Sequence, residues 1–289
     1  CVLVAGNGDL NVKYYKGKFD AYQRTYIIED NSNGRLLIPY LYYFLELYVE
    51  ELRKQSIGGV IKYIKLGNLT DAIIELPSIE KQKEVVNILN KSRKIVVSKN
   101  MQLQEYDQLI KSRFVEMFGD IENNSKQYKK QFLKDICSIK TGGTPSRNHP
   151  EYFEGTIPWI TTVALGKVEI DKSDATELIT EDAVNNSSTK IIKMGSILFG
   201  TRVGVGKTSI NKVDLCTNQD IAAITEISKD YDLIFLKMVL DSYSEYFNNQ
   251  KRGATIQGIT TDTLKNIYVP IIDLESQKEF SKFVKQVDK

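Results

Sequence analysis

VLVAGNGDLNVKYYKGKFDAYQRTYII, residues 2–28, has a counterpart in ILFGTRVGVGKTSINKVDLCTNQDIAAI, residues 197–224. Each stretch has an apolar run typical of a β-strand, a glycine-rich turn, a polar run and then a glutamine, Gln23 or Gln219, ahead of a second apolar run. Self-similarity on this scale predicts two copies of one domain rather than a solenoid, whose repeats are shorter.

The correspondence continues beyond these strands. Residues 37–55 and 233–250 both carry apolar side chains at helical spacing, and both end in glutamine. Residues 72–89 then match residues 267–284, and the separation stays at about 195 residues throughout. The second copy also has an N-terminal half, residues 128–194, that has no counterpart ahead of the first copy. The sequence therefore predicts a complete second domain and only the C-terminal part of a first one.

A long helix is predicted from about Ile79 to Phe118. Alternate steps of three and four from Gln82 meet mostly apolar residues, which is the pattern of a coiled-coil seam. Such a helix measures roughly 60 Å and needs a partner to cover the seam, so we expect an antiparallel helix or another protein to pack on it. An alternative is a long core helix within a single globular domain. The candidate partner-binding side chains are Leu89, Val96, Leu103, Tyr106 and Ile110.

These patterns predict an α+β protein in which two similar mixed α/β domains are separated by a long coiled-coil helix. The expected boundaries are 1–76 for the C-terminal part of the first domain, 77–119 for the spacer helix, 120–271 for the second domain and 272–289 for the start of a second spacer helix. Because residue 1 is Cys and the chain stops within a helical pattern, we expect a fragment, a processed chain or a rearranged gene product.

Composition narrows the class of protein. The net charge of +2 gives no global field for nucleic acid, so any such binding must come from local basic clusters. No apolar run is long enough to span a bilayer and no signal peptide is seen, so we expect a cytoplasmic protein that does not contact membranes. The three cysteines have no metal-ligand spacing, and neither a metal nor a cofactor is expected.

Catalytic patterns are missing from the sequence. His149 is the only histidine, which argues against histidine-based triads and histidine-rich metal sites. The run from Gly200 to Thr208 resembles a phosphate-binding loop, but its first glycine stands one position too early for the required spacing. A methyltransferase would need a cofactor-binding glycine motif and an Asn-Pro-Pro-aromatic motif, and neither occurs. The sequence therefore predicts no catalytic residues.

The second domain opens with LKDICSIKTGGTPSRNHPEYFEGTIPWIT, from Leu133. This opening, the GSILFGTRVGVGKTSI run from Gly195, the pair Asn218-Gln219 and the Gln-Lys-Glu that begins each helix closely resemble the target-recognition domains of type I restriction–modification specificity subunits. The resemblance covers essentially the whole chain. It implies two domains that each read one half of a split sequence in double-stranded DNA. It also implies spacer helices that dock the adenine methyltransferase (modification) subunits, which a restriction subunit can join.

Candidate DNA contacts lie in polar turns of the second domain. Gly142 and Gly143 permit a tight turn with exposed amides, and hydroxyl and guanidinium groups nearby can donate to phosphates or base edges. Trp159 is expected in the core rather than as a stacking platform. For each single residue, an ordinary solvated surface is the alternative. The candidate DNA-binding residues are Thr144, Ser146, Arg147, Thr161, Thr162, Arg202, Lys207, Lys251 and Arg252.

Two other functions remain open at this point. The chain could be the C-terminal recognition region of a fused methyltransferase–nuclease enzyme, which several hundred preceding residues with methyltransferase motifs would reveal. It could also be a coiled-coil adaptor without DNA contact, which the absence of salt-sensitive DNA binding would favour. In either case, self-association through the helix is a further expected contact.

Overall fold

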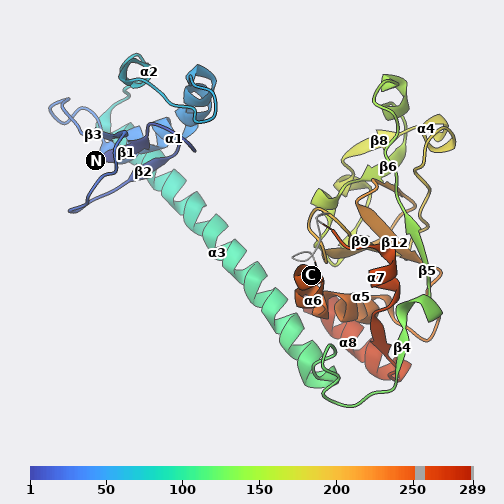
Figure 1. The fold of residues 1–289 in the computed structure, drawn as a ribbon. Helices are drawn as coiled ribbons and strands as arrows, with labels where there is room; N and C mark the ends of the chain where they lie inside the picture. The colour runs from blue at the N-terminus through green and yellow to red at the C-terminus, as the bar shows by residue number, and fades with distance from the viewer. Residues whose placement is uncertain (251–257, 288–289) are drawn as a thin grey trace. The chain divides into compact units, whose positions relative to one another are not determined.

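The computed structural model describes residues 1–250 and 258–287. The chain divides into two compact units, Cys1–Leu103 and Gln104–Lys289, and the division falls inside one continuous helix (Figure 1). That helix, α3, spans Ile79–Phe118, so the predicted helix is confirmed at both ends. No helix among the described residues is long and apolar enough to cross a membrane.

The first unit is a small sheet packed against one helix. Its strands are β1 (Val2–Ala5), β2 (Val12–Tyr14) and β3 (Thr25–Ile28), which are antiparallel in the order β2-β1-β3. Helix α1 (Ile38–Gln55) buries one face in the core that it shares with the sheet. The short helix α2 (Leu66–Thr70) follows before α3 begins. The core consists of Val2, Val4, Leu10, Leu41, Leu45, Val49, Leu52 and Ile64. Side chains four or three positions apart on α1 supply half of that core, as expected of an amphipathic helix.

The second unit repeats this arrangement inside a larger sheet. Five strands run in the order β5-β12-β9-β10-β7, and three of them, β12, β9 and β10, correspond to β3, β1 and β2. Their bounds are β5 (Ser138–Thr141), β7 (Glu169–Ile170), β9 (Ile197–Gly200), β10 (Thr208–Asn211) and β12 (Ile221–Thr225). Helices α5 (Leu233–Ser242) and α6 (Ser244–Gln250) stand where the first unit has the single helix α1, and α7 (Thr261–Lys265) corresponds to α2.

Smaller elements complete the second unit. A second sheet has the order β11-β6-β8, from Cys216–Thr217, Ile157–Ile160 and Glu177–Ile179, and a third pairs β4 (Lys130–Phe132) with β13 (Tyr268–Pro270). Helix α4 (Glu181–Asn185) follows β8, and α8 (Leu274–Val287) follows β13. Single-turn 3-10 helices lie at Leu133–Asp135, Pro150–Phe153, Thr162–Ala164 and Lys172–Asp174.

Hydrogen bonds confirm the predicted duplication at the level of atoms. The buried Gln82 donates to the carbonyls of Arg35 and Pro77 and accepts from the amide of Leu37. In the second unit the buried Gln277 donates to the carbonyls of Asp230 and Ile272 and accepts from the amide of Asp232. Gln82 therefore ties the first turn of α3 to the segment that leads into α1, and Gln277 ties the first turn of α8 to the segment that leads into α5.

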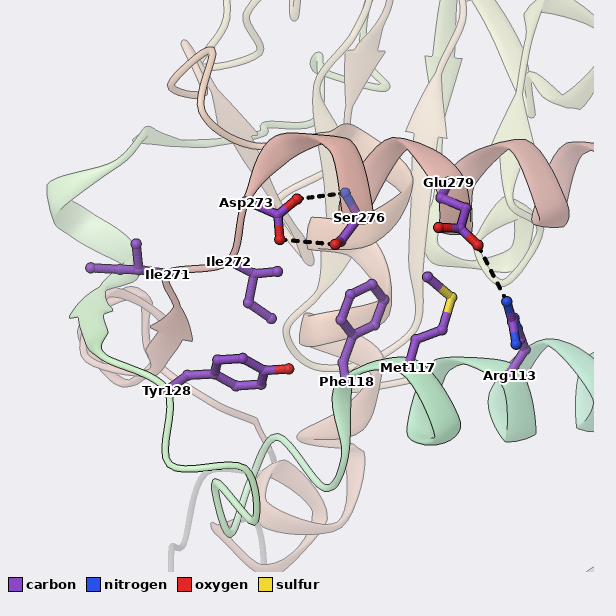
Figure 2. Close-up of a pocket in the computed structure, with 9 residues that line it drawn as sticks. All are labelled: Arg113, Met117, Phe118, Tyr128, Ile271, Ile272, Asp273, Ser276 and Glu279. Atoms are coloured by element: carbon purple, nitrogen blue, oxygen red, sulfur yellow. Dashed lines mark hydrogen bonds and ion pairs between the residues drawn. The ribbon is translucent and has the colours of Figure 1, made fainter.

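The aromatic core of the second unit includes the C-terminal turns of α3. Phe114 and Phe118 pack against Phe235 of α5 and Phe280 of α8, with ring centroids between 4.9 and 5.9 Å apart. Beside them, Arg113 pairs with Glu279 at 3.4 Å at one side of a pocket of about 480 Å³ (Figure 2). Tyr128 and the segment before α8 line the other side of that pocket.

Candidate nucleic-acid interface

Three loops of the second unit leave the same end of the five-stranded sheet. Strand β12 begins at Ile221, which pairs with Gly200 at the end of β9, and Ala222 pairs with Thr141 at the end of β5. The loops that follow β5 and β9 and the loop that precedes β12 therefore lie together. They contain the candidate residues Thr144, Ser146, Arg147, Arg202 and Lys207.

Residues Asn218, Gln219 and Asp220, called here the hub loop, connect these segments. The amide of Asn218 donates to the carbonyl of Ile160, and the hydroxyl of Thr144 donates to the side chain of Gln219 at 2.5 Å. Both the amide and the hydroxyl of Thr201 donate to the carbonyl of Asp220, at 2.8 and 3.0 Å. The hub loop thus fixes the positions of the loops that carry Thr144 and Arg202.

The glycine pair after β5 allows close backbone packing and does not expose its amides to solvent. Gly142 and Gly143 are buried, and their amides donate to the carbonyls of Ile221 and Thr217. A Cβ on Gly142 would lie 2.2 Å from the carbonyl oxygen of Asn218, and one on Gly143 would lie 2.5 Å from the amide nitrogen of Thr189. The expectation of exposed amides at this turn is therefore wrong, because the two glycines allow the backbone to press against the hub loop and its neighbours.

The turn between β9 and β10 presents two exposed basic side chains. Arg202 lies 3.8 Å from the carboxylate of Asp220, and more than half of its side chain is exposed. Lys207 is exposed, and no ion pair of its ammonium group occurs among residues 1–250 and 258–287. The turn joins two antiparallel strands, whereas a nucleotide phosphate-binding loop leads from a strand into a helix.

Arg147 is held firmly by its surroundings. Its guanidinium group makes two hydrogen bonds of 2.7 Å to the carboxylate of Glu177 on β8, and it lies 4.2 Å from the ring centroid of Phe153. The hydrogen bonds to Glu177 raise the pKa of Arg147, so the group stays charged. Trp159, a neighbour of the same guanidinium, is 3% exposed and donates to the carbonyl of Gly143, which confirms its predicted place in the core.

The remaining hydroxyl candidates differ in accessibility. Ser146 is exposed and accepts from the amide of Asn148. Thr161 is half-buried and lies 3.0 Å from the hydroxyl of Thr176. Thr162 is only 6% exposed, so its side chain does not face a groove, and the expectation for this residue is corrected. Lys251 and Arg252 lie outside the described residues.

The predicted partner-binding residues on α3 fall into two groups. Leu89, Val96, Leu103 and Tyr106 are exposed by 36, 58, 61 and 47%. Ile110 is only 7% exposed because it belongs to the second unit's own core, so it does not offer a partner surface. The seam predicted from the sequence is therefore exposed between Leu89 and Tyr106 and covered at its C-terminal end.

Sequence reasoning missed Glu177, Gln219 and Asp220 as parts of this site. Glu177 reaches Arg147 only through the pairing of β6 with β8, which no local pattern announces. The pair Asn218-Gln219 was visible as a motif, and its position directly before a buried strand was the available signal for the hub loop.

The described part of the chain shows no group of acidic, histidine or cysteine side chains placed to hold a metal ion. Burial raises the pKa of the Cys216 thiol to about 11 and that of the Cys137 thiol to about 12, so both are protonated at neutral pH. His149 is exposed and lies against the carboxylate of Glu151 at 2.9 Å.

Comparisons with known proteins agree on one family. The family model of the type I restriction modification DNA specificity domain matches residues 5–105 and 125–289. The type I restriction enzyme EcoDI specificity subunit of Escherichia coli is 26% identical over 317 residues, which cover 99% of this chain and 70% of that protein. The MjaIX specificity subunit of Methanocaldococcus jannaschii is 32% identical over 173 residues, which cover 58% of this chain and 40% of that protein.

Solved structures show the same fold. The crystal structure of a type I restriction–modification S subunit from M. genitalium matches with a TM-score of 0.62 at 15% identity, over 99% of this chain and 75% of that one. Because the family model covers both units, the chain belongs to the family of type I restriction–modification DNA specificity domains, and its function is the recognition of a DNA sequence in such a system.

Proposed function

We propose that the chain is a non-catalytic recognition subunit whose two units each read one half of a split site in double-stranded DNA. The observation that carries this proposal is the set of loops at one end of the second unit's sheet, where Thr144, Arg202 and Lys207 are exposed and the hub loop contacts Thr144 and Arg202. Side chains presented from rigid turns suit both phosphate contacts and base-edge contacts.

Arg147 and Arg202 are proposed as the principal contacts, and they differ in how they are held. Both terminal nitrogens of the Arg147 guanidinium group donate to Glu177, whereas Arg202 faces Asp220 at the longer distance of 3.8 Å. Arg202 is therefore free to turn towards a guanine edge at little cost. Arg147 must either break its hydrogen bonds to Glu177 before it contacts a base, or contact a phosphate with the edge of its guanidinium group that Glu177 leaves free.

We expect Arg202→Ala to reduce discrimination between cognate and scrambled duplexes by about 1–3 kcal/mol, the usual value of a bidentate arginine–guanine pair. Loss of a phosphate contact would instead weaken binding to all duplexes. It would also reduce the slope of the logarithm of the binding constant against the logarithm of the salt concentration by about 0.9 per contact. Binding of the assembled methyltransferase should be measured for Arg147→Ala and Arg202→Ala across a salt series.

Glu177→Gln is the matched control for Arg147, because it loosens the ion pair while leaving the arginine in place. If Arg147 contacts DNA, Arg147→Ala weakens binding and Glu177→Gln does not. If neither arginine variant alters affinity or preference, the assignment of both residues is wrong.

We also propose that the exposed seam of α3 docks modification subunits, to which a restriction subunit can join. Charged side chains in the middle of an apolar helix interface are strongly unfavourable, because they are buried without partners. The double variant Leu89→Asp/Leu103→Asp is therefore expected to lose co-purification with a modification subunit. Leu47→Asp, at an 83% exposed position on α1, is the matched control and should retain assembly. Retained assembly of a folded double variant would contradict the docking role.

A further inference from the structure

In each unit, three chain segments meet beside the turn that follows the first repeated strand. In the second unit they contribute Arg202 from the turn, Asp220 from the hub loop and Gly258 from the segment before α7. Arg202 faces Asp220 at 3.8 Å, and a Cβ on Gly258 would lie 2.9 Å from the Cγ of Arg202. Gly258 therefore makes room for the stem of the arginine.

The same three segments meet in the first unit through matching backbone hydrogen bonds. The amide of Gly6 donates to the carbonyl of Arg24, as the amide of Thr201 donates to that of Asp220, each at 2.8 Å. The amide of Ile64 donates to Gly6, as that of Ile259 donates to Thr201, each at 2.9 Å. By this correspondence Arg24 takes the place of Asp220.

The side chains at this junction have exchanged roles between the two units. Asn7 follows Gly6 in the turn, where the second unit has Arg202, and Tyr63 precedes Ile64, where the second unit has Gly258. The guanidinium of Arg24 lies 5.6 Å from the ring centroid of Tyr63. Each junction therefore holds one arginine. In the second unit it is Arg202, from the turn, and in the first unit it is Arg24, at the position that corresponds to Asp220 of the hub loop.

Arg24 has the properties of a displayed side chain. Its side chain is exposed and forms no ion pair with any residue in 1–250 or 258–287. The guanidinium group contacts the face of the Tyr63 ring instead of a carboxylate. Its φ of 63° lies in the left-handed region, which costs a non-glycine residue about 1 kcal/mol or more and persists only where the surroundings fix it. Here the hydrogen bond from Gly6 fixes it, and a Cβ on Gly6 would come within 2.4 Å of the carbonyl oxygen of Arg24.

We propose that Arg24 is a specificity-determining residue of the first unit and acts on its half of the DNA site as Arg202 acts on the half read by the second unit. Tyr63 is the positioning residue that orients the guanidinium. This inference rests on the proposed division of the DNA site between the two units.

The test uses the full chain assembled with its modification subunits and plasmid DNA carrying a randomised insert. The methylated sequences are read for the wild-type complex and for Arg24→Ala, Arg202→Ala, Tyr63→Leu and the control Arg35→Ala. Arg35 is also an exposed arginine of the first unit, and its side chain donates only to the carbonyl of Ser32 among the described residues.

The expected result is a split motif in the wild type that loses base preference in one half with Arg24→Ala and in the other half with Arg202→Ala. The loss should be about 10- to 100-fold at one or two positions, as for one arginine–guanine pair. Tyr63→Leu should weaken the same positions as Arg24→Ala, while Arg35→Ala leaves the motif unchanged.

Arg24→Ala with an unchanged motif, with uniform weakening of all sequences, or with loss in the same half as Arg202→Ala would overturn the inference. A wild-type complex that methylates without a split motif would instead overturn the proposed function. Melting curves of each variant, compared with wild type, separate these outcomes from loss of the folded chain.

Discussion

Replacing Phe118 by alanine is expected to destabilise the second unit by about 3–5 kcal/mol, the usual cost of emptying the space of a buried phenylalanine. Phe118 is 1% exposed and contacts the rings of Phe114, Phe235 and Phe280. These rings come from α3, α5 and α8, so the cavity would loosen three helices at once. The loss is comparable to much of the stability of a typical domain.

The chain supplies its own probe for this measurement. Trp159 is the single tryptophan and is buried in the second unit, so its fluorescence during denaturant unfolding reports on that unit alone. Val115→Ala is the matched control, because Val115 lies on the same helix and is 55% exposed. It should change the unfolding free energy by less than about 0.5 kcal/mol. Equal effects of the two substitutions would mean that the aromatic cluster does not stabilise the unit.

The second large effect is expected for Gln277→Ala, at about 3 kcal/mol or more. The glutamine side chain serves the carbonyls of Asp230 and Ile272 and the amide of Asp232, and it is fully buried. Each buried polar group that loses its partner costs about 1–3 kcal/mol, which exceeds the value of an average hydrogen bond. Removing the side chain should therefore detach the start of α8 from the segment leading into α5.

The same tryptophan signal measures this variant, with Gln104→Ala, at an exposed position of α3, as its control. Hydrogen exchange of the Asp232 amide gives a local readout, because that amide bonds to the glutamine oxygen at 2.9 Å. An unchanged exchange rate together with an unchanged unfolding midpoint would show that water replaces the side chain without cost.

The sequence predicted those parts of the fold that repeat or continue over long stretches. The ends of α3 and the duplicated strands could be predicted because the helical pattern is unbroken and the two copies keep a constant separation. Both signals extend over many residues, so a single atypical residue does not obscure them. The predicted partner surface on α3 was wrong at its C-terminal end, where it included Ile110. There α3 packs on α5 and α8 as part of a globular core, which buries Ile110, Phe114 and Phe118.

The candidate site was predicted as a set of loops but not as a set of contacts. The turn residues Thr144 and Arg202 were found because glycine-rich turns with basic and hydroxyl side chains are visible locally. The partners Glu177 and Asp220, the burial of Thr162 and the close packing of Gly142 and Gly143 depend on which strands pair. Strand pairing between distant segments is decided by tertiary packing, which a single sequence does not display.

The two buried glutamines that hold the starts of α3 and α8 carry no charge at any pH. Their hydrogen bonds lie away from solvent, so dissolved ions neither screen nor compete for them, in contrast to surface ion pairs. The attachment of each long helix should therefore remain equally stiff from dilute buffer to molar salt. A titration with salt would then change the electrostatic attraction between protein and nucleic acid while leaving these joints intact.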